Sequence, residues 1–299
     1  MEIVAPGIYV ETSYASGNVG AIVTGAGVVC VDVPELPSRA HHWFAQIRAV
    51  TDQAIIALIQ TDYDQERAVS TYILDVPVIA HDATWEKMKV YSNEKVLSQI
   101  HDLVRDDVGG SDWSVRMPEV TFSERLILYK GAREVHALYA GGHSPGSCMV
   151  YVPEESVLFT GDVVFNKVHP SMTQAETKQW LAALTALRKM TVETIVPGHG
   201  PVCGKEATQP LSEYIRDLRA MIRRSYQAGR SKSETSSAVI SEFLSAFPYD
   251  ESERDRVRLQ VKGGSDRIYD EYRTEAKASL SVSKNASKRS AAKRQGGHP

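Results

Sequence analysis

The first half of the chain alternates short, β-branched apolar runs with turns. Three such runs, separated by Gly, Asn or Ala-Gly, predict an antiparallel meander: Gly7–Glu11, Val19–Thr24 and Gly27–Val33. Pro37–Val50 has helical spacing. The continuous apolar run Ala54–Ile59 predicts a strand that is buried on both faces. A polar loop up to Glu66 and a short helix are expected after it.

A second buried strand, Val76–Ala80, and a long, mostly polar helical stretch, Ala83–Val104, complete this half. The second half is again rich in strands before a helix at Ala175–Lys189 and a last strand at Glu193–Val196. Its other predicted strands are Val120–Phe122, Leu126–Tyr129, Glu134–Tyr139, Cys148–Val152 and Ser156–Phe159. Two halves of this kind predict an α/β (α+β) protein with two β-sheets packed face to face and helices outside.

The pattern changes after residue 209. Leu211–Gln227, Lys232–Phe247 and Glu251–Tyr272 have helical spacing, so residues 210–275 form a predicted C-terminal helical region. Residues 276–299 are rich in Ser, Ala and Lys and are predicted to be a disordered tail. From Lys277 onward this tail carries six basic residues and no acid; subtracting +6 from the net charge of −3 leaves −9 for residues 1–276. An acidic body argues against nucleic-acid binding.

The composition, with 42% hydrophobic and 24% charged residues, is that of a globular protein. No apolar run approaches the roughly 20 residues that span a bilayer, and the N-terminal residues do not have the pattern of a signal peptide. Cys30, Cys148 and Cys203 lack the spacing of a zinc site or a disulfide framework. We therefore expect a cytoplasmic protein with reduced thiols, and the pattern leaves the oligomeric state open.

Three glycine-rich turns place side chains that can bind metals at the ends of predicted strands. They are GGHSPGS around His143, FTGD ending in Asp162, and PGHGP around His199. Loops at strand ends build sites on a rigid scaffold, and glycines let the backbone approach an ion closely. Two histidines and an aspartate suit zinc, iron or manganese.

In this order the three turns resemble the metallo-β-lactamase superfamily, over about Val4–Gly204. The resemblance implies a four-layer αββα sandwich of two mixed β-sheets. It also implies that His143 binds one metal, that Asp162 bridges two metals, and that His199 binds the second.

The chain departs from this family in the HxHxDH motif, which follows a buried strand and reads DxDxER here. Aligned by Thr61, Asp62 and Asp64 replace the two histidines of the first metal. Glu66 replaces the aspartate, and Arg67 replaces the histidine of the second metal. All three histidines of the motif are replaced by charged residues.

Arginine has five hydrogen-bond donors and no acceptor, so Arg67 cannot ligate a cation. We expect its guanidinium to stand in for the second metal, in a buried ion pair with Asp162 or Glu66. Around the first position, Asp62, Asp64, His143 and Asp162 can hold one divalent ion. These harder ligands favour Mn, Fe or Mg over Zn.

Two hypotheses for the function follow. In the first, the protein is a hydrolase that acts with at most one metal ion on a small-molecule ester, lactone or thioester. Asp64 or Glu66 would orient the attacking water, and Arg67 would stabilise the oxyanion. In the second, the protein is a non-catalytic pseudoenzyme or binding protein. Redox chemistry at iron, as in the flavodiiron branch of the family, is a third hypothesis. The predicted substrate contacts are His169, Asn166 and Tyr63.

Overall fold

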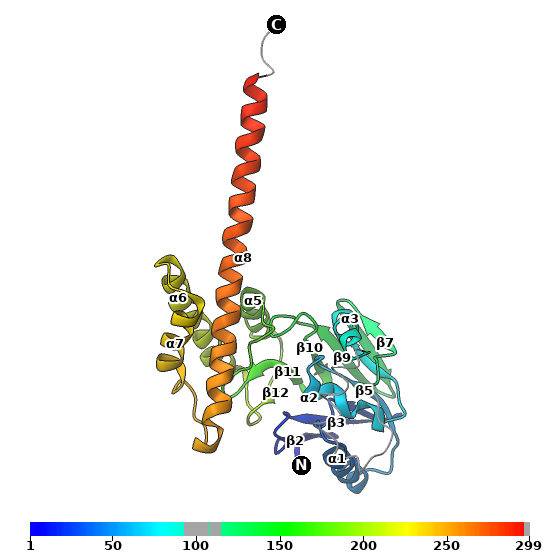
Figure 1. Ribbon diagram of the computed structural model, residues 1–299. Helices are drawn as coiled ribbons and strands as arrows, with labels where there is room; N and C mark the ends of the chain where they lie inside the picture. Colours follow the sequence, from blue (N-terminus) through cyan, green and yellow to red (C-terminus); the bar gives the residue numbers. More distant parts are fainter. Residues whose placement is uncertain (93–106, 108–114, 296–299) are drawn as a thin grey trace. The chain divides into compact units, whose positions relative to one another are not determined.

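The protein is described here by a computed structural model that covers residues 1–92, 107 and 115–295. Its first half forms a seven-stranded mixed sheet in the order β1-β2-β3-β4-β5-β6-β7 (Figure 1). β1 to β4 are antiparallel neighbours, and β4 to β7 are parallel neighbours. The strands are β1 (Glu2–Ala5), β2 (Ile8–Glu11), β3 (Val19–Thr24), β4 (Gly27–Val31), β5 (Ile55–Ile59), β6 (Val78–His81) and β7 (Val120–Phe122).

The second sheet has five strands in the order β12-β11-β10-β9-β8. β8 to β11 pair antiparallel, and β11 pairs parallel with β12. The strands are β8 (Arg125–Lys130), β9 (Arg133–Tyr139), β10 (Cys148–Val152), β11 (Val157–Phe165) and β12 (Thr194–His199).

Helices and short 3-10 turns connect and follow the strands. The first half contains α1 (Pro37–Val50), α2 (Gln65–Ala68), η1 (Val69–Ile73), α3 (Asp82–Met88) and η2 (Lys89–Ser92). The second half contains η3 (Pro153–Glu155), α5 (Thr177–Leu187), η4 (Lys205–Ala207), α6 (Thr208–Gln227), α7 (Lys232–Phe243), η5 (Glu251–Glu253) and α8 (Arg254–Gln295). None of the helices in the described part of the chain has both the length and the apolar character needed to cross a bilayer.

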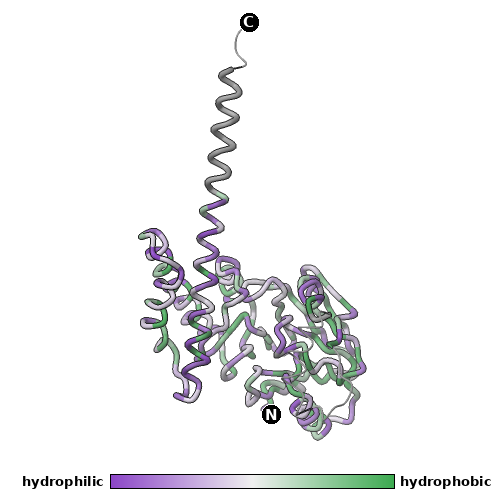
Figure 2. The backbone as a smooth tube through the Cα atoms, in the orientation of Figure 1, coloured by the Kyte–Doolittle hydropathy of each residue, from purple (hydrophilic) through white to green (hydrophobic). Residues whose placement is uncertain are grey.

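The inner faces of the two sheets meet in one hydrophobic core. Ile22 and Val29 of the first sheet pack there with Val150 and Phe159 of the second. The outer face of the first sheet is covered by α1, whose Trp43 joins a second core. On the second sheet, α5 packs against β11 and the Trp180 indole donates to Val163 O at 2.8 Å. These layers form the predicted αββα sandwich. Figure 2, in the orientation of Figure 1, shows hydrophobic stretches of backbone in the region of the two sheets.

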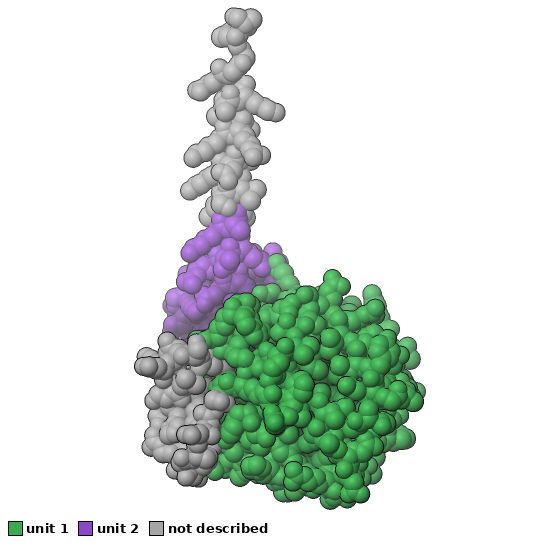
Figure 3. All heavy atoms as spheres, turned by 90° about the vertical axis from the view of Figure 1, so that its right-hand side faces the viewer, with its two compact units in different colours: residues 1–170, 174–215 green, residues 171–173, 216–299 purple. Residues whose placement is uncertain are grey.

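The chain divides into two compact units (Figure 3). The first comprises residues 1–170 and 174–215, and the second residues 171–173 and 216–299. The boundary between these units falls within α6, and the domain division expected at residue 210 stays a prediction. Within the second unit α7 packs against α8, and Ser236 Oγ donates to Asp266 Oδ1 at 2.6 Å.

Several sequence predictions are corrected by the structure. β1 was not predicted, and β11 continues six residues beyond the expected end at Phe159. α8 continues to Gln295, and the Ala, Lys and Arg residues of this stretch have high helix propensity. The predicted disorder of residues 276–299 stays a prediction. Of the long helix expected at Ala83–Val104, α3 and η2 account for the first part, and the rest lies outside the described residues.

Candidate active site

Two parallel strands place Asp32 and Thr61 side by side at one edge of the first sheet. β4 pairs with β5, with Val31 beside Ile59, so the residues that follow each strand are neighbours. Thr61 donates its backbone N–H to Asp32 Oδ1 at 2.8 Å and its hydroxyl to Oδ2 at 2.6 Å. Asp32 is buried and has a φ of 55°, a left-handed conformation in which aspartate is enriched.

Arg67, on α2, joins this carboxylate to a second one. Its Nη1 lies 2.9 Å from Asp32 Oδ2 and its Nη2 lies 2.6 Å from Asp162 Oδ1. The Arg67 side chain is 2% exposed, so both ion pairs are shielded from water. The structure thus contains the predicted pair with Asp162, with a partner that the sequence analysis missed. Asp32 was missed because the predicted strand extended to Val33 and so included it. In the structure β4 ends at Val31, directly before Asp32.

Glycine backbone closes around the guanidinium. A Cβ on Gly17, whose φ is 115°, would lie 2.6 Å from Gly198 O and 2.7 Å from Arg67 Nη2. Arg67 also donates to the carbonyl oxygens of Asn18, at 3.2 Å, and Gly198, at 3.3 Å. The positive charge is therefore fixed by backbone dipoles as well as by two carboxylates.

The two carboxyl groups beside Arg67 differ in their electrostatics. Burial alone would raise the pKa of Asp162, but the charges of Arg67 and His199 hold it well below its usual value. Burial raises the pKa of Asp32, although Arg67 and the Thr61 hydrogen bonds oppose that shift. Asp162 is thus the more firmly ionised partner of the guanidinium.

His199 lies on the same side as Arg67. Its Nδ1 is 3.1 Å from Asp162 Oδ1, and its ring stacks on Phe165 with centroids 5.1 Å apart. The sequence places His199 and Asp162 just after strands, but in the structure both lie within strands. His199 is the last residue of β12, and Asp162 lies within β11. The β11–β12 register shifts on either side of Gly161, whose φ is 49°. The irregular pairing of β11 with β12 therefore lies next to Asp162.

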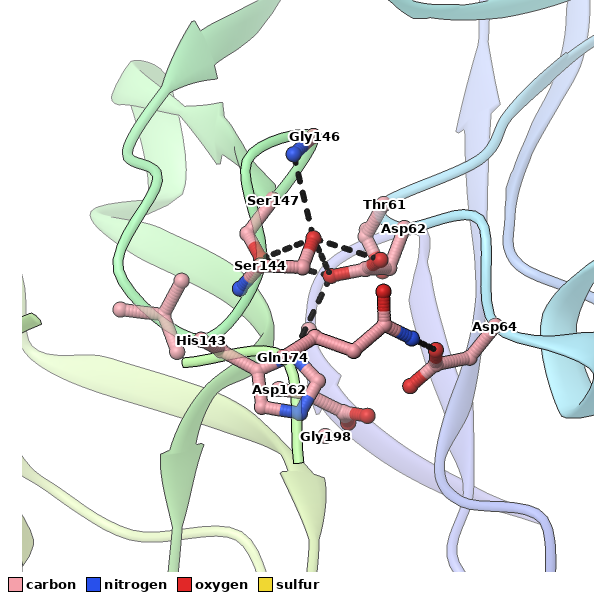
Figure 4. Close-up of polar contacts among 12 residues, drawn as sticks. Thr61, Asp62, Asp64, His143, Ser144, Gly146, Ser147, Asp162, Gln174 and Gly198 are labelled. Carbon is pink, nitrogen blue, oxygen red and sulfur yellow. Dashed lines mark hydrogen bonds and ion pairs between the residues drawn. The ribbon is translucent and has the colours of Figure 1, made fainter. Parts of the chain in front are cut away.

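Asp62 follows β5 and accepts hydrogen bonds on both carboxylate oxygens (Figure 4). The Tyr63 backbone N–H donates to Oδ1 at 2.7 Å, and Ser147 Oγ donates to Oδ2 at 2.5 Å. Ser144 Oγ lies 2.8 Å from each oxygen, and His143 Nδ1 lies 3.2 Å from Oδ2. The GGHSPGS turn therefore supplies three side chains to one buried carboxylate.

His143 is buried beside Asp62 and Trp180, whose ring centroid is 5.4 Å away. Burial alone would lower the pKa of His143. The hydrogen bond to Asp62 and the nearby charges of Asp162, Asp62 and Asp64 raise it to about 9. These surroundings therefore favour the protonated form of the imidazole.

Asp62, Asp64 and His143 form a group that can hold a metal ion. One ligand atom from each lies within 4.8 Å of the others. Asp64 is half-buried, and its Oδ1 accepts a hydrogen bond of 2.8 Å from Gln174 Nε2. Asp162 and His199, also predicted as metal ligands, are not part of this group of three.

The three predicted substrate contacts are buried and each contacts other parts of the protein. The Tyr63 hydroxyl donates to Gln174 Oε1, and Asn166 Nδ2 donates to Pro201 O at 2.8 Å. His169 packs edge-on against Tyr214. Their role in binding a substrate stays a prediction. The side chain of Glu66, the other predicted catalytic carboxylate, lies outside the described part of the structure.

The comparisons with known proteins agree with this fold and these turns. Residues 72–199 match the family model of the metallo-beta-lactamase superfamily. A metallo-beta-lactamase family protein of Thermus thermophilus superimposes with a TM-score of 0.67 at 16% identity, over 92% of this chain and 96% of that one. A metallo-beta-lactamase from Pontibacter korlensis gives 0.60 at 17% identity, over 72% and 97%. The matched part of the chain, residues 72–199, thus belongs to the metallo-β-lactamase superfamily.

Two curated relatives are similar in sequence. A linear primary-alkylsulfatase of Pseudomonas sp. (strain ATCC 19151) is 22% identical over 236 residues, which are 66% of this chain and 44% of the relative. A hydroxyacylglutathione hydrolase of Bartonella quintana (strain Toulouse) is 32% identical over 82 residues, 27% of this chain and 30% of the relative. The chain thus spans less than half the length of either relative.

Proposed function

We propose that this protein is a hydrolase that works with at most one divalent ion, and that Arg67 replaces the second ion of its superfamily. The observation that carries the proposal is the pair of buried contacts from Arg67 to Asp32 and Asp162. The guanidinium supplies a permanent positive charge 2.6 Å from the carboxylate that would otherwise bridge two metals. A second cation beside it would be repelled, strongly so in a buried site.

The donors around Asp62, by contrast, fit one ion. Two carboxylates and an imidazole that approach within 4.8 Å match the ligands of Mn, Fe or Zn. An ion bound there would lower the pKa of a bound water and polarise the scissile bond of a substrate. Asp64, half-buried, is our choice for the carboxylate that orients this water and accepts its proton.

The sequence suggests that Arg67 stabilises an oxyanion, but we propose a different role for it. Both of its Nη atoms already bind carboxylates, so little of its charge is available to a substrate. We assign it the task of holding Asp32 and Asp162 in place and of balancing their charge.

The proposed substrate is a small molecule with a hydrolysable ester linkage, such as an ester, a lactone or a thioester. The likeness to an alkylsulfatase over two thirds of the chain adds sulfate esters to that class. The substrate panel should therefore include a linear primary alkyl sulfate and a hydroxyacylglutathione alongside carboxylic esters and lactones.

Metal analysis of protein purified without added metal tests the proposal. We expect one ion per chain, and we expect both the ion and the turnover of the panel to be lost in an Asp62→Ala/His143→Ala double variant. A His41→Ala/Asp52→Ala variant changes the same residue types at exposed positions and should keep both. Protein that holds no ion, and that cleaves nothing with Mn, Fe or Zn supplied, would contradict the proposal.

One observation favours a non-catalytic binding protein as the second candidate. Both oxygens of Asp62 already accept hydrogen bonds from the chain, and His143 is protonated beside them. A metal ion must displace that proton before it can use the imidazole. A folded protein whose melting temperature is the same with and without a chelator or added divalent ions would support this candidate.

A further inference from the structure

We infer that Gln174 is the positioning residue that orients Asp64 in the ion site, and that Tyr63 fixes the orientation of the Gln174 amide. This inference rests on the proposed function, because Asp64 is a ligand only if the site takes an ion. It adds to that function two residues of the chain that would control ion affinity without touching the ion.

The Gln174 side chain reaches Asp64 from the segment between β11 and α5 (Figure 4). Its Nε2 donates to Asp64 Oδ1 at 2.8 Å, and its Oε1 accepts from the Tyr63 hydroxyl. Tyr63 is 6% exposed, and its ring packs with Ala68, Val69 and Met88. The far end of this chain of hydrogen bonds is therefore anchored in a hydrophobic cluster.

The chemistry of the groups fixes which way the amide points. An ionised carboxylate only accepts hydrogen bonds, so the nitrogen of the Gln174 amide must face Asp64. Its oxygen then faces the Tyr63 hydroxyl, which can donate its proton. A flipped amide would set two acceptors against each other at Asp64, so Tyr63 favours the productive orientation.

Asp64, like other carboxylate ligands, needs a hydrogen-bond partner to fix the plane of its carboxylate. The terminal torsion of an aspartate is broad, so its lone pairs are not aimed by rotamer preference alone. The other two members of the group are already held: Asp62 by Ser144 and Ser147, and His143 by Asp62. Gln174 supplies the corresponding hydrogen bond for Asp64, and partners of this kind orient metal ligands.

Calorimetric titration with Mn²⁺ and with Zn²⁺ tests the inference on the full chain. Loss of a hydrogen bond that orients a ligand costs about 10–100-fold in metal affinity, so Gln174→Leu should raise the ion Kd by that factor. Gln179→Leu is the matched control. Gln179 is also half-buried and also contacts a tyrosine hydroxyl, that of Tyr139 at 3.0 Å, but has no contact with Asp64 in the described structure. It should bind the ion as the wild-type protein does.

Tyr63→Phe separates positioning from simple packing. This variant keeps the ring in its cluster but removes the hydroxyl, so it should also weaken ion binding, by less than Gln174→Leu. Because Tyr63 acts through Gln174, adding Tyr63→Phe to Gln174→Leu should cause no further loss. Additive losses would indicate that each residue acts through packing and would overturn the inference.

The outcomes separate the inference from the function on which it rests. If wild-type protein binds an ion and Gln174→Leu binds it equally well, the inference is wrong and the proposed hydrolase survives. If wild-type protein binds neither Mn²⁺ nor Zn²⁺, while circular dichroism shows it to be folded, the single-ion site is wrong and the inference falls with it.

Discussion

The two sides of the candidate site balance their charges in opposite ways. On one side, which we call the Arg67 side, the positively charged guanidinium of Arg67 lies between Asp32 and Asp162 and forms an ion pair with each. On the other, the Asp62 side, Asp62 and Asp64 are acidic, and their charges help to raise the pKa of the neighbouring His143 to about 9. A guanidinium is permanent, whereas a proton can be exchanged for an ion. The comparison indicates that the first side is structural and that the second can still respond to its surroundings.

The largest expected effect comes from Arg67→Met, which removes the cation but keeps much of the side-chain volume. It leaves Asp32 and Asp162 buried without their partner, which should lower the free energy of unfolding by about 3–5 kcal/mol. Denaturant unfolding measures this. A loss below about 1 kcal/mol would show that the Arg67 side is not structural.

A compensated variant distinguishes lost charge balance from lost packing. Arg67→Met combined with Asp32→Asn and Asp162→Asn removes the charges together, as in buried ion-pair networks that tolerate replacement by uncharged groups. We expect it to recover a large part of the stability lost by Arg67→Met. If it is as unstable as Arg67→Met alone, packing around the guanidinium is the dominant contribution.

The next effect concerns the Asp62 side. An ion that binds the folded protein and is supplied at 100 times its Kd stabilises it by about 2.7 kcal/mol. We expect this stabilisation from Mn²⁺ in wild-type protein, its loss in Asp64→Asn, and its persistence in His199→Ala, because His199 lies on the Arg67 side. Thermal unfolding with and without the ion measures it. If His199→Ala also loses the stabilisation by Mn²⁺, the ion binds on the Arg67 side, and the comparison drawn here is wrong.

The sequence predicts the sandwich well because local periodicity reports local structure. The ranges Val19–Thr24, Pro37–Val50 and Cys148–Val152 agree with β3, α1 and β10. Strand ends are less well predicted: β11 continues to Phe165 through an irregularity at Gly161, because its pairing with β12 sustains it. The prediction for the tail rests on low apolar content, which says whether a segment can build a core and not whether its backbone is helical, as α8 is drawn to Gln295.

The residues of the candidate site divide in the same way into those that the sequence predicts and those that it does not. Each of the three turns and the DxDxER motif is a short continuous segment of sequence, so His143, Asp62 and Arg67 could be identified from the sequence alone. Asp32 and Gln174 do not lie in a recognisable motif. Their roles follow from tertiary contacts, of Asp32 with Arg67 and of Gln174 with Asp64. The sequence did contain one signal for Asp32, namely a carboxylate directly after a buried apolar strand. That signal could be used only if the strand was predicted to end at Val31. Gln174 has no comparable signal.

The smallest effect tests whether the turn around His143 holds the Asp62 side together without an ion. Ser147→Ala removes the hydroxyl that donates to Asp62 at 2.5 Å and accepts from Ser144 N at 2.9 Å. A hydrogen bond to a charged group contributes about 2 kcal/mol, and Asp62 keeps its other donors, so we expect a loss of about that size in chelator-treated protein. Ser237→Ala, which removes an exposed hydroxyl bonded to Ser233 O, should change stability by less than about 0.5 kcal/mol. If Ser147→Ala is equally harmless, the serine hydroxyls are incidental to Asp62, and a cation rather than the turn stabilises that carboxylate.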